Sequence, residues 1–442
     1  MKLVRLALVA FVVLLPLSEA RASGFAVNEM SAAGVANAHA GGAAAAEDLG
    51  TIFFNPAGLT RLPGRQFMVV GSGIRPSIEF ENRRSVSTVG TPLSGGNGGD
   101  AGTWSVVPAL YYAMDIDPRL RFGIGIQSPF GLITEYDDNW VGRYQALKSE
   151  LTSVNINPSL AYKVNDRLSV GAGISAQYVD VELSRAIDFG SACVGTLGLA
   201  PCAASGFTPQ ARDGKVKVDG DDWGYGFNLG ALYSLDEKTR FGIAYRSKIS
   251  HDITGDANFT KPAGLPAPLA AAPVFRNTGA RASLDLPESL NLSGYVDIDS
   301  KWSLMGDIQW MHWSRFEELR IRFDNGAPDS VTPEHWRNTV RVAVGANYRY
   351  NDMWKLRGGI AYDPSPVRDE FRTPRIPDAD RTWLSFGAQY KQSKNAVWDF
   401  GYAHLFVKDS SINKAEPPLG GRLIGDYQND VNILSVQYRH MF

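Results

Sequence analysis

From about Arg65 onward, apolar residues recur at every second position along short runs of the chain. In the run 168–178 one face is apolar and the other carries polar residues and glycine, and the run 340–350 repeats this pattern. A period of two predicts β-strands rather than helices. In a soluble sandwich the apolar face would point to a core. In a membrane barrel it would meet lipid, and the polar and glycine face would line the lumen.

The connections between these runs favour the barrel. Tight polar turns occur at 115–119, 165–166, 236–238, 299–301, 351–352 and 392–395. They alternate with longer connections near 81–101, 137–150, 190–212, 255–280, 323–335, 370–380 and 410–424. Strict alternation of short and long connections is typical of periplasmic turns and extracellular loops. We therefore predict an all-β protein, a transmembrane antiparallel β-barrel of about 14 strands with both termini on the periplasmic side.

Aromatic residues and the chain end agree with this fold. Tyrosines such as Tyr233 precede the short turns, and aromatics such as Phe241 and Trp354 follow them, as expected of an aromatic girdle at the headgroup level. The last residues alternate up to a terminal Phe442, which resembles the C-terminal signal of outer-membrane barrels. The expected location is the outer membrane of a Gram-negative bacterium. The expected partners are the barrel assembly machinery, outer-membrane lipid and lipopolysaccharide.

The first residues read as a secretory signal peptide, 1–22. Lys2 and Arg5 precede an apolar run over 6–17, and Ala20-Arg21-Ala22 forms a cleavage pattern that would place the mature start near Ser23. The apolar run is too short to cross a bilayer as a helix. We expect the remaining chain to form a hatch, or plug, over 23–63 and a barrel over 64–442.

Composition narrows the function. The formal net charge of −2 gives no indication of a nucleic-acid partner. Cys193 and Cys202 lie close together in a Gly/Ala/Ser/Pro-rich segment, where a local disulfide within one loop is expected in the oxidising periplasm. Neither cysteine has neighbouring ligand residues for a metal. No cofactor is expected, and the chain is expected to be a monomer.

Residues 24–63 interrupt the strand pattern with an Ala- and Gly-rich segment and a sharp Asn55-Pro56-Ala57 turn. A compact segment of this length could lie outside or inside the barrel, and a lumen of about 14 strands is too wide for side chains alone to fill. The segment GFAVNEMSAAGVANAHAGGAAAAED, the following FFNPAGLTRL and the later IPDADRTWLS closely resemble the FadL family of long-chain fatty acid transporters. The resemblance covers essentially the whole mature chain.

The resemblance implies a fourteen-stranded barrel closed by an N-terminal hatch, with passive uptake of hydrophobic substrates. Some members of the family take up aromatic or alkane hydrocarbons instead. It also points to Arg185 and Arg320 as ligands of a carboxylate head group, which arginine suits through bidentate hydrogen bonds. Strand parity places Arg185 in the lumen. For Arg320, we expect Leu319 and Ile321 to face lipid after a bulge near 314–318, which would turn Arg320 inward.

A route out of the barrel is also predicted. Pro129, Phe130 and Gly131 interrupt an otherwise good strand, and proline lacks the N–H that strand pairing needs. In a barrel wall this interruption indicates a lateral opening, and in a soluble protein it would be only a bulge. The family places a kink at this point, and Phe25 of the hatch is expected to line the ligand pocket.

Three other functions compete with uptake of hydrophobic compounds. An outer-membrane hydrolase would need a catalytic motif, but the histidines are scattered and the chain contains neither G-x-S-x-G nor H-E-x-x-H. We therefore expect no enzyme. A general diffusion porin would need an open polar lumen, which the hatch should block. A purely structural or adhesive barrel is a third possibility.

Overall fold

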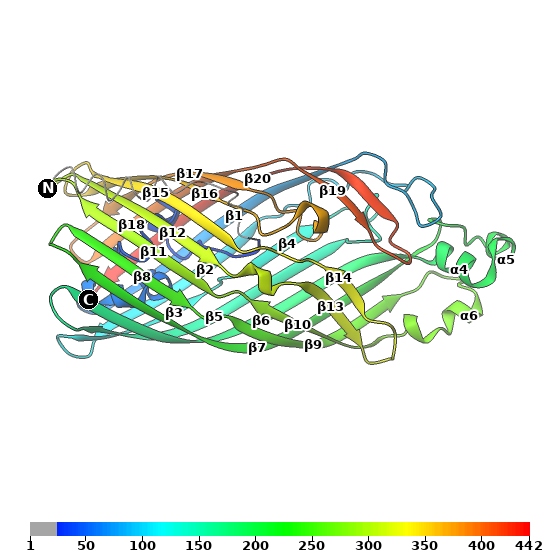
Figure 1. Ribbon diagram of the computed structural model, residues 1–442, viewed down its shortest axis with the longest axis horizontal. Coiled ribbons are helices and arrows are strands. Elements are labelled where there is room, and N and C mark those ends of the chain that lie inside the picture. Colours follow the sequence, from blue (N-terminus) through cyan, green and yellow to red (C-terminus); the bar gives the residue numbers. More distant parts are fainter. Residues whose placement is uncertain (1–23) are drawn as a thin grey trace.

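The computed structural model describes residues 24–442, so the expected signal peptide lies outside the described residues. The strands form one closed antiparallel sheet in which each strand pairs with its neighbours and the first pairs with the last (Figure 1). This closed sheet is a 14-stranded barrel, as the turn pattern predicts. Several strands are broken by kinks, so the continuous segments are numbered up to β20.

The strand segments follow one another along the chain in the order of their numbers. They are β1 (Gln66–Asn82), β2 (Ser105–Asp115), β3 (Leu120–Gln127), β4 (Gly131–Glu135), β5 (Lys148–Lys163), β6 (Leu168–Asp188), β7 (Asp213–Ser234), β8 (Thr239–Arg246), β9 (Ile249–Thr260), β10 (Thr278–Leu286), β11 (Ser289–Asp297), β12 (Trp302–Met311), β13 (Glu318–Phe323), β14 (Ser330–Pro333), β15 (Thr339–Arg349), β16 (Trp354–Asp363), β17 (Arg381–Lys391), β18 (Ala396–Val407), β19 (Ser410–Ala415) and β20 (Arg422–Met441).

The helices are short. They are α2 (Ala32–Ala36), α3 (Thr51–Phe54), α4 (Phe189–Leu197), α5 (Leu199–Ala204), α6 (Ala267–Ala270), and the 3₁₀ helices η1 (Pro56–Arg61), η2 (Pro273–Phe275), η3 (Trp313–Arg315) and η4 (Asp369–Phe371). Within residues 24–442, none of these helices is long and apolar enough to cross a membrane. Helices α4, α5 and α6 lie together at one end of the molecule (Figure 1).

The predicted turns lie between the strands as expected. The short connections gather at one end of the barrel with the C-terminus, and the long connections with α4, α5 and α6 gather at the other (Figure 1). The long connection predicted over 410–424 is wrong for most of its length, because β19 pairs with β20 from Ser410↔Tyr427 to Ala415↔Arg422. This hairpin lies beyond the lipid-facing band, so its residues do not show the apolar alternation that marks the lower strands.

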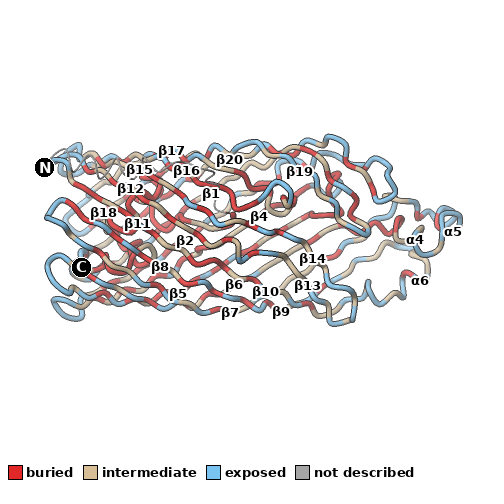
Figure 2. The backbone as a smooth tube through the Cα atoms, viewed as in Figure 1, coloured by how far each residue is buried: buried red, intermediate tan, exposed pale blue. Residues whose placement is uncertain are grey.

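The lower half of the barrel, near the short turns, shows the expected two faces (Figure 2). Apolar side chains such as Ile174 (67% exposed) and Ile360 (53% exposed) point outward. Tryptophan and tyrosine pair across neighbouring strands beside the short turns, as Trp302 does with Tyr348 at 4.7 Å and Trp354 with Tyr390 at 4.8 Å between ring centroids. These positions form the membrane-facing band and its inner girdle.

Residues 24–62 pack inside the lower half of the barrel, where most of them are buried. The barrel strands carry glycine where this segment comes closest. A Cβ atom at Gly230 would lie 2.0 Å from Asn55 Oδ1, and one at Gly242 would lie 1.9 Å from the Ala43 carbonyl oxygen. Only glycine permits such an approach. The glycine positions on the inward face are therefore contact points for the N-terminal segment, which we call the hatch.

Candidate functional site

Above the hatch, the lumen contains an apolar cavity of about 850 Å³, which we call the upper cavity. Its walls come from strands β4 to β7, β9, β10 and β13. They include Leu132, Leu151, Val181, Leu183, Ile253 and Leu319. These side chains occupy inward positions that hold polar residues or glycine lower in the barrel. The upper cavity therefore presents a hydrocarbon-like surface inside the protein.

Aromatic rings close the floor of the upper cavity. Phe25 of the hatch lies 4.8 Å from Trp313, 5.5 Å from Trp336 and 6.0 Å from both Phe130 and Phe316, measured between ring centroids. Trp313 and Phe316 reach inward because the wall kinks at η3, between β12 and β13. The expectation that Phe25 lines the pocket agrees with this position.

A smaller polar chamber of about 450 Å³ adjoins the upper cavity on the side of the long loops, and we call it the head chamber. It is lined by Arg185, Arg375, Lys414 and Glu416, and Arg375 also lines the upper cavity. The Arg375 guanidinium donates to Ser149 Oγ at 3.0 Å and to the Lys148 carbonyl at 3.3 Å. Positive side chains thus lie at one end of an apolar cavity.

The charge at this end of the upper cavity depends on two groups whose pKa values are shifted by burial. Burial, together with the nearby Arg185 charge, lowers the pKa of Arg375 to about 10, so Arg375 is still charged at neutral pH. Burial raises the pKa of Glu334 to about 8, although a hydrogen bond from Trp336 Nε1 (3.0 Å) opposes the shift. Glu334 lines the upper cavity and is mostly neutral at pH 7. The arginines are therefore not cancelled by this carboxyl.

The sequence anticipated one of these two arginines. Arg185 faces the lumen, as its strand parity predicts. Arg375 was missed, because it lies in the long connection 364–380, to which no parity applies. Arg375 stands between Pro374 and Ile376-Pro377, and these prolines stiffen the segment without indicating that it folds back into the lumen.

The inward orientation expected for Arg320 is wrong. Leu319 and Ile321 line the upper cavity, and Arg320 points to the outside of the barrel, where it pairs with Glu318 (2.6 Å) and Asp329 (2.9 Å). The parity rule requires that an apolar face meets lipid. At this height the lumen itself is apolar, and odd positions stay inward from Met311 through the kink to Ile321.

The barrel wall opens beside the hatch. The ladder between β2 and β3 stops at Leu110↔Ile126, and the residues of β2 before Leu110 pair only with β1. The interrupting segment turns inward and pairs with the start of the hatch: Val27 N donates to the Pro129 carbonyl (2.9 Å), and Gly131 N donates to the Phe25 carbonyl (3.0 Å). Pro129, Phe130 and Gly131 thus leave a gap in the sheet.

This wall opening leads into a cavity that continues to the outside of the barrel. The cavity is lined on the wall side by Trp104, Val106 and Gly131, and it shares Leu132 and Leu151 with the upper cavity. Trp104 and Val106 are 66% and 76% exposed. The wall opening therefore adjoins both the upper cavity and the exterior of the barrel at the apolar band.

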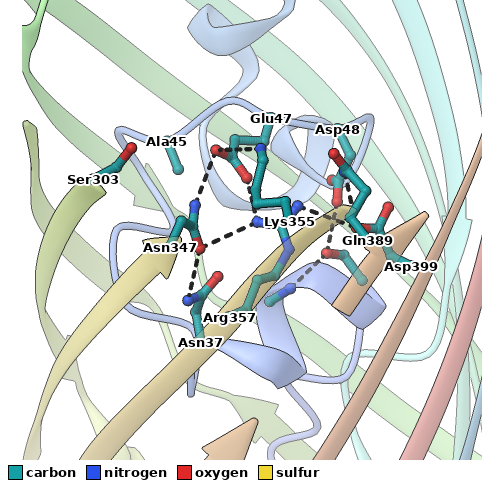
Figure 3. A network of polar contacts seen from close by, with 12 residues as sticks. Asn37, Ala45, Glu47, Asp48, Ser303, Asn347, Lys355, Arg357, Gln389 and Asp399 are labelled. Atoms are coloured by element: carbon teal, nitrogen blue, oxygen red, sulfur yellow. Dashed lines mark hydrogen bonds and ion pairs between the residues drawn. The ribbon is translucent and has the colours of Figure 1, made fainter. Parts of the chain in front are cut away.

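A buried polar network fixes the hatch to the lower wall (Figure 3). Glu47 of the hatch accepts from Arg357, Lys355 and Asn347, and Arg357 also pairs with Asp399 at 3.1 Å. Burial alone would raise the pKa of Glu47, but the charges of Arg357 and Lys355 hold it well below its ordinary range. Such a network is stable only when every member is paired, so it favours one position of the hatch.

The Asn55-Pro56-Ala57 turn anchors the hatch at a second place. Asn55 Nδ2 donates to the Ala43 carbonyl (2.7 Å) within the hatch and to the Ala231 carbonyl (3.0 Å) on β7. Asn55 Oδ1 accepts from Ala57 N (3.1 Å) and caps η1, whose first residue is Pro56. Asparagine caps and proline at the first helical position both stabilise this geometry.

Cys193 and Cys202 join α4 to α5 by a disulfide at the end of the barrel with the long loops. Around the disulfide, Phe189, Phe207 and Leu269 form a small apolar core between two of these loops. The disulfide thus cross-links a compact cap at this end of the barrel. Among residues 24–442, no group of three or more His, Cys, Asp or Glu side chains is arranged to hold a metal.

Comparison with known proteins agrees with this architecture. Residues 13–442 match the family model described as outer membrane protein transport protein (OMPP1/FadL/TodX). This chain belongs to the OMPP1/FadL/TodX family. It is 35% identical to a putative outer membrane protein of Neisseria meningitidis, covering 95% of this chain and 94% of the relative. It is 32% identical to the long-chain fatty acid transport protein of Escherichia coli O157:H7, over 90% of this chain and 91% of the relative.

The fold of the OMPP1/FadL/TodX family is known from crystals. The structure of a Pseudomonas aeruginosa FadL homologue superposes with a TM-score of 0.87 at 27% identity, over 95% of this chain and 100% of that one. The family consists of outer-membrane transport proteins rather than enzymes. The protein is therefore an outer-membrane β-barrel transporter.

Proposed function

We propose that this protein takes up long-chain fatty acids, or closely related hydrophobic carboxylates, across the outer membrane. The observation that carries the proposal is an apolar cavity with an excess of positive charge at one end, where Arg185, Arg375 and Lys414 face the single carboxylate of Glu416 in the head chamber. Burial of a tail yields about 0.8 kcal/mol for each methylene, so the cavity wall supplies most of the affinity. A buried carboxylate needs a positive partner, and Arg375 and Arg185 lie where the head of such a ligand would be.

The proposed path runs from the long loops through the head chamber into the upper cavity, and from there through the wall opening. A hydrophobic ligand gains nothing by entering the aqueous periplasm, because transfer of a long tail into water is unfavourable by several kcal/mol. The wall opening delivers it to membrane hydrocarbon instead. Phe25 and its neighbours must move for the ligand to pass. Transport is then downhill and passive, driven by consumption of the substrate in the cell.

Uptake of aromatic or alkane hydrocarbons by the same cavities is the second candidate. The apolar lining would accept such molecules, but the arginines would then have no ligand group to bind. The test uses a strain whose own copy of this gene has been deleted, and it asks whether the gene on a plasmid restores growth and substrate uptake. Rescue of growth on oleate, without rescue of toluene or alkane use, supports the proposal. Rescue on the hydrocarbons alone would refute it.

A general diffusion porin is the third candidate, and conductance distinguishes it. The hatch occupies the lower lumen, so the purified protein in a planar bilayer should show little steady ion current. Large and steady channels from the intact protein would favour the porin. Deletion of residues 24–60 should raise the conductance if the hatch is what blocks the lumen.

A further inference from the structure

A further inward arginine, Arg246, is the last residue of β8 and lines a different cavity from Arg375 and Arg185. Its guanidinium donates to Ser175 Oγ (3.2 Å), to the Phe53 carbonyl (3.0 Å) and to Asn157 Oδ1 (3.4 Å), and it lies 4.2 Å from the centre of the Phe53 ring. All of these partners are neutral. Within residues 24–442, no carboxylate lies within ion-pair distance of Arg246.

Arg246 lines a cavity of about 560 Å³, which we call the lower cavity. The lower cavity shares Ala26, Val27 and Phe130 with the cavity behind the wall opening. Its remaining walls include Phe53 and Phe54 of the hatch and Met311 of β12. The lower cavity is therefore separate from the upper cavity, apolar on several sides, and next to the place where the wall opens.

Two other inward arginines show that anchoring the hatch does not require such a cavity. Arg240 donates to the Ala44 and Ala45 carbonyls, and Arg341 donates to the Ala38 carbonyl. Neither of them is among the residues that line the lower cavity. Arg246 resembles them in contacting the hatch, but it alone of the three also lines the lower cavity.

A second polar group in the lower cavity lacks a protein partner. Asn291 lines the lower cavity and is 8% exposed, and its Oδ1 atom has no hydrogen-bond partner within the described part of the chain. Buried polar atoms are nearly always paired. The amide of Asn291 can present either its oxygen or, after rotation, its NH₂ group to a molecule in the cavity.

We propose that the lower cavity is a second binding site for the carboxylate of the substrate, with Arg246 as its main ligand. A buried guanidinium without a negative partner is costly, and an anionic head group at this place would offset that cost. The head would rest beside Arg246 while the tail already extends through the wall opening. The inference rests on the proposed function and adds a step to it: the carboxylate passes from Arg375 to Arg246 before release.

The direct test is to locate the head group by crystallography. Crystals of the full mature chain are soaked with 2-bromohexadecanoate, whose bromine lies next to the carboxylate and gives an anomalous signal. We expect a bromine peak in the lower cavity beside Arg246, in addition to one in the head chamber. The lower peak should be lost in Arg246→Met and retained in Arg240→Met, which removes a hatch contact but no cavity charge.

The outcomes separate the two proposals. A peak in the head chamber alone would overturn the second site and leave the proposed function standing. Peaks in neither place would count against both. A peak beside Arg246 from a bromide ion, but not from the brominated fatty acid, would show a site for small anions only and would also overturn the inference. The wild-type soak decides the question even if Arg246→Met fails to fold.

A transport measurement supplies an independent readout. Oleate uptake by cells that carry Arg246→Met should fall about fivefold or more, because a charged hydrogen bond is lost, while oleate binding in the head chamber is unchanged. Arg246→Lys should restore much of the uptake. Equal losses in Arg246→Met and Arg240→Met, for oleate and for uncharged oleyl alcohol alike, would mean that Arg246 only holds the hatch.

Discussion

The two halves of the lumen are lined by surfaces of different polarity. In the lower half, inward positions carry polar residues and glycine, and the hatch fills the space through contacts such as Glu47 with Arg357 and Asn55 with Ala231. In the upper half, inward positions such as Leu183 and Ile321 are apolar and surround an 850 Å³ cavity. One barrel thus combines a region that binds its own chain with a region suited to a hydrophobic guest. The wall opening adjoins the boundary between them.

The test with the largest expected effect is to close the wall opening. A Cβ atom at Gly131 would meet Val27 Cγ2 at 3.5 Å and the Leu151 carbonyl at 3.7 Å, which are ordinary contacts, so Gly131→Trp should fold and fill the wall opening. We expect oleate uptake to fall by about a hundredfold, toward background, because the apolar route is blocked. Uptake of radiolabelled oleate by intact cells measures this, together with oleate binding to the purified variant.

Gly71→Trp is the matched control, because Gly71 on β1 is exposed and a Cβ atom added there would have no other atom within 4 Å. It should leave uptake unchanged. If Gly131→Trp folds, binds oleate and transports it normally, the ligand travels down the lumen and the lateral route must be abandoned.

The second test removes the anchor of the lower half. Arg357→Met leaves the Glu47 and Asp399 carboxylates without their guanidinium, and breaking a buried pair typically costs about 3–5 kcal/mol. We expect faster amide exchange in residues 24–62 and larger ion currents in planar bilayers. Arg349→Met is the control, because Arg349 is exposed and its guanidinium donates to the Ser300 carbonyl rather than to a residue of the hatch. Unchanged exchange and currents in Arg357→Met would show that this network does not hold the hatch.

The third test uses pH to change the charge of Glu334 in the upper half. The pKa of Glu334 is raised by burial to about 8, so its neutral form stabilises the fold most below the ordinary glutamate range, and that stability is lost as pH rises through 8. Ionised Glu334 also repels a carboxylate ligand. Oleate affinity should therefore fall about threefold or more between pH 7 and pH 9. Glu334→Gln should flatten the dependence of oleate affinity on pH between pH 7 and pH 9. An equally steep fall in that variant would show that a group other than Glu334 causes it.

The smallest expected effect concerns Arg320. Arg320 lies outside the upper cavity and is paired with Glu318 and Asp329, so Arg320→Ala should change oleate affinity less than about twofold, as exposed ion pairs contribute little. Fluorescence titration with oleate measures the affinity. A tenfold loss of oleate affinity in Arg320→Ala would mean that Arg320 contacts the head group, and it would contradict the outward orientation described above.

The difference between the two halves also explains which orientations of residues could be predicted from the sequence. Alternation predicted the lower strands, because there the outside is apolar and the lumen is not, and the parity of β6 continued upward from that region to the inward position of Arg185. The same rule failed at Arg320, where the apolar positions Leu319 and Ile321 face an apolar cavity. Pro129 and Gly131 marked the interruption of strand pairing, since proline cannot donate to a ladder.

Residues in loops could not be placed by periodicity. Arg375 reaches the upper cavity because the connection 364–380 folds back into the lumen, and that path depends on contacts with distant strands, such as the bond to Ser149. The buried partners of Glu47 could likewise not be predicted, because Arg357 on β16 and Asp399 on β18 come together only once both strands pair with β17.

The central claim is that the upper half binds a hydrophobic carboxylate with its head at Arg375 and Arg185. The measurement that tests it most directly is the affinity of the purified protein for oleate and for oleyl alcohol, before and after Arg375→Ala and Arg185→Ala. A hydrogen bond to a charged group contributes about 1.5–3 kcal/mol, so oleate should lose about tenfold or more in affinity. The alcohol should lose much less. Equal losses for both ligands, or none for either, would contradict the account.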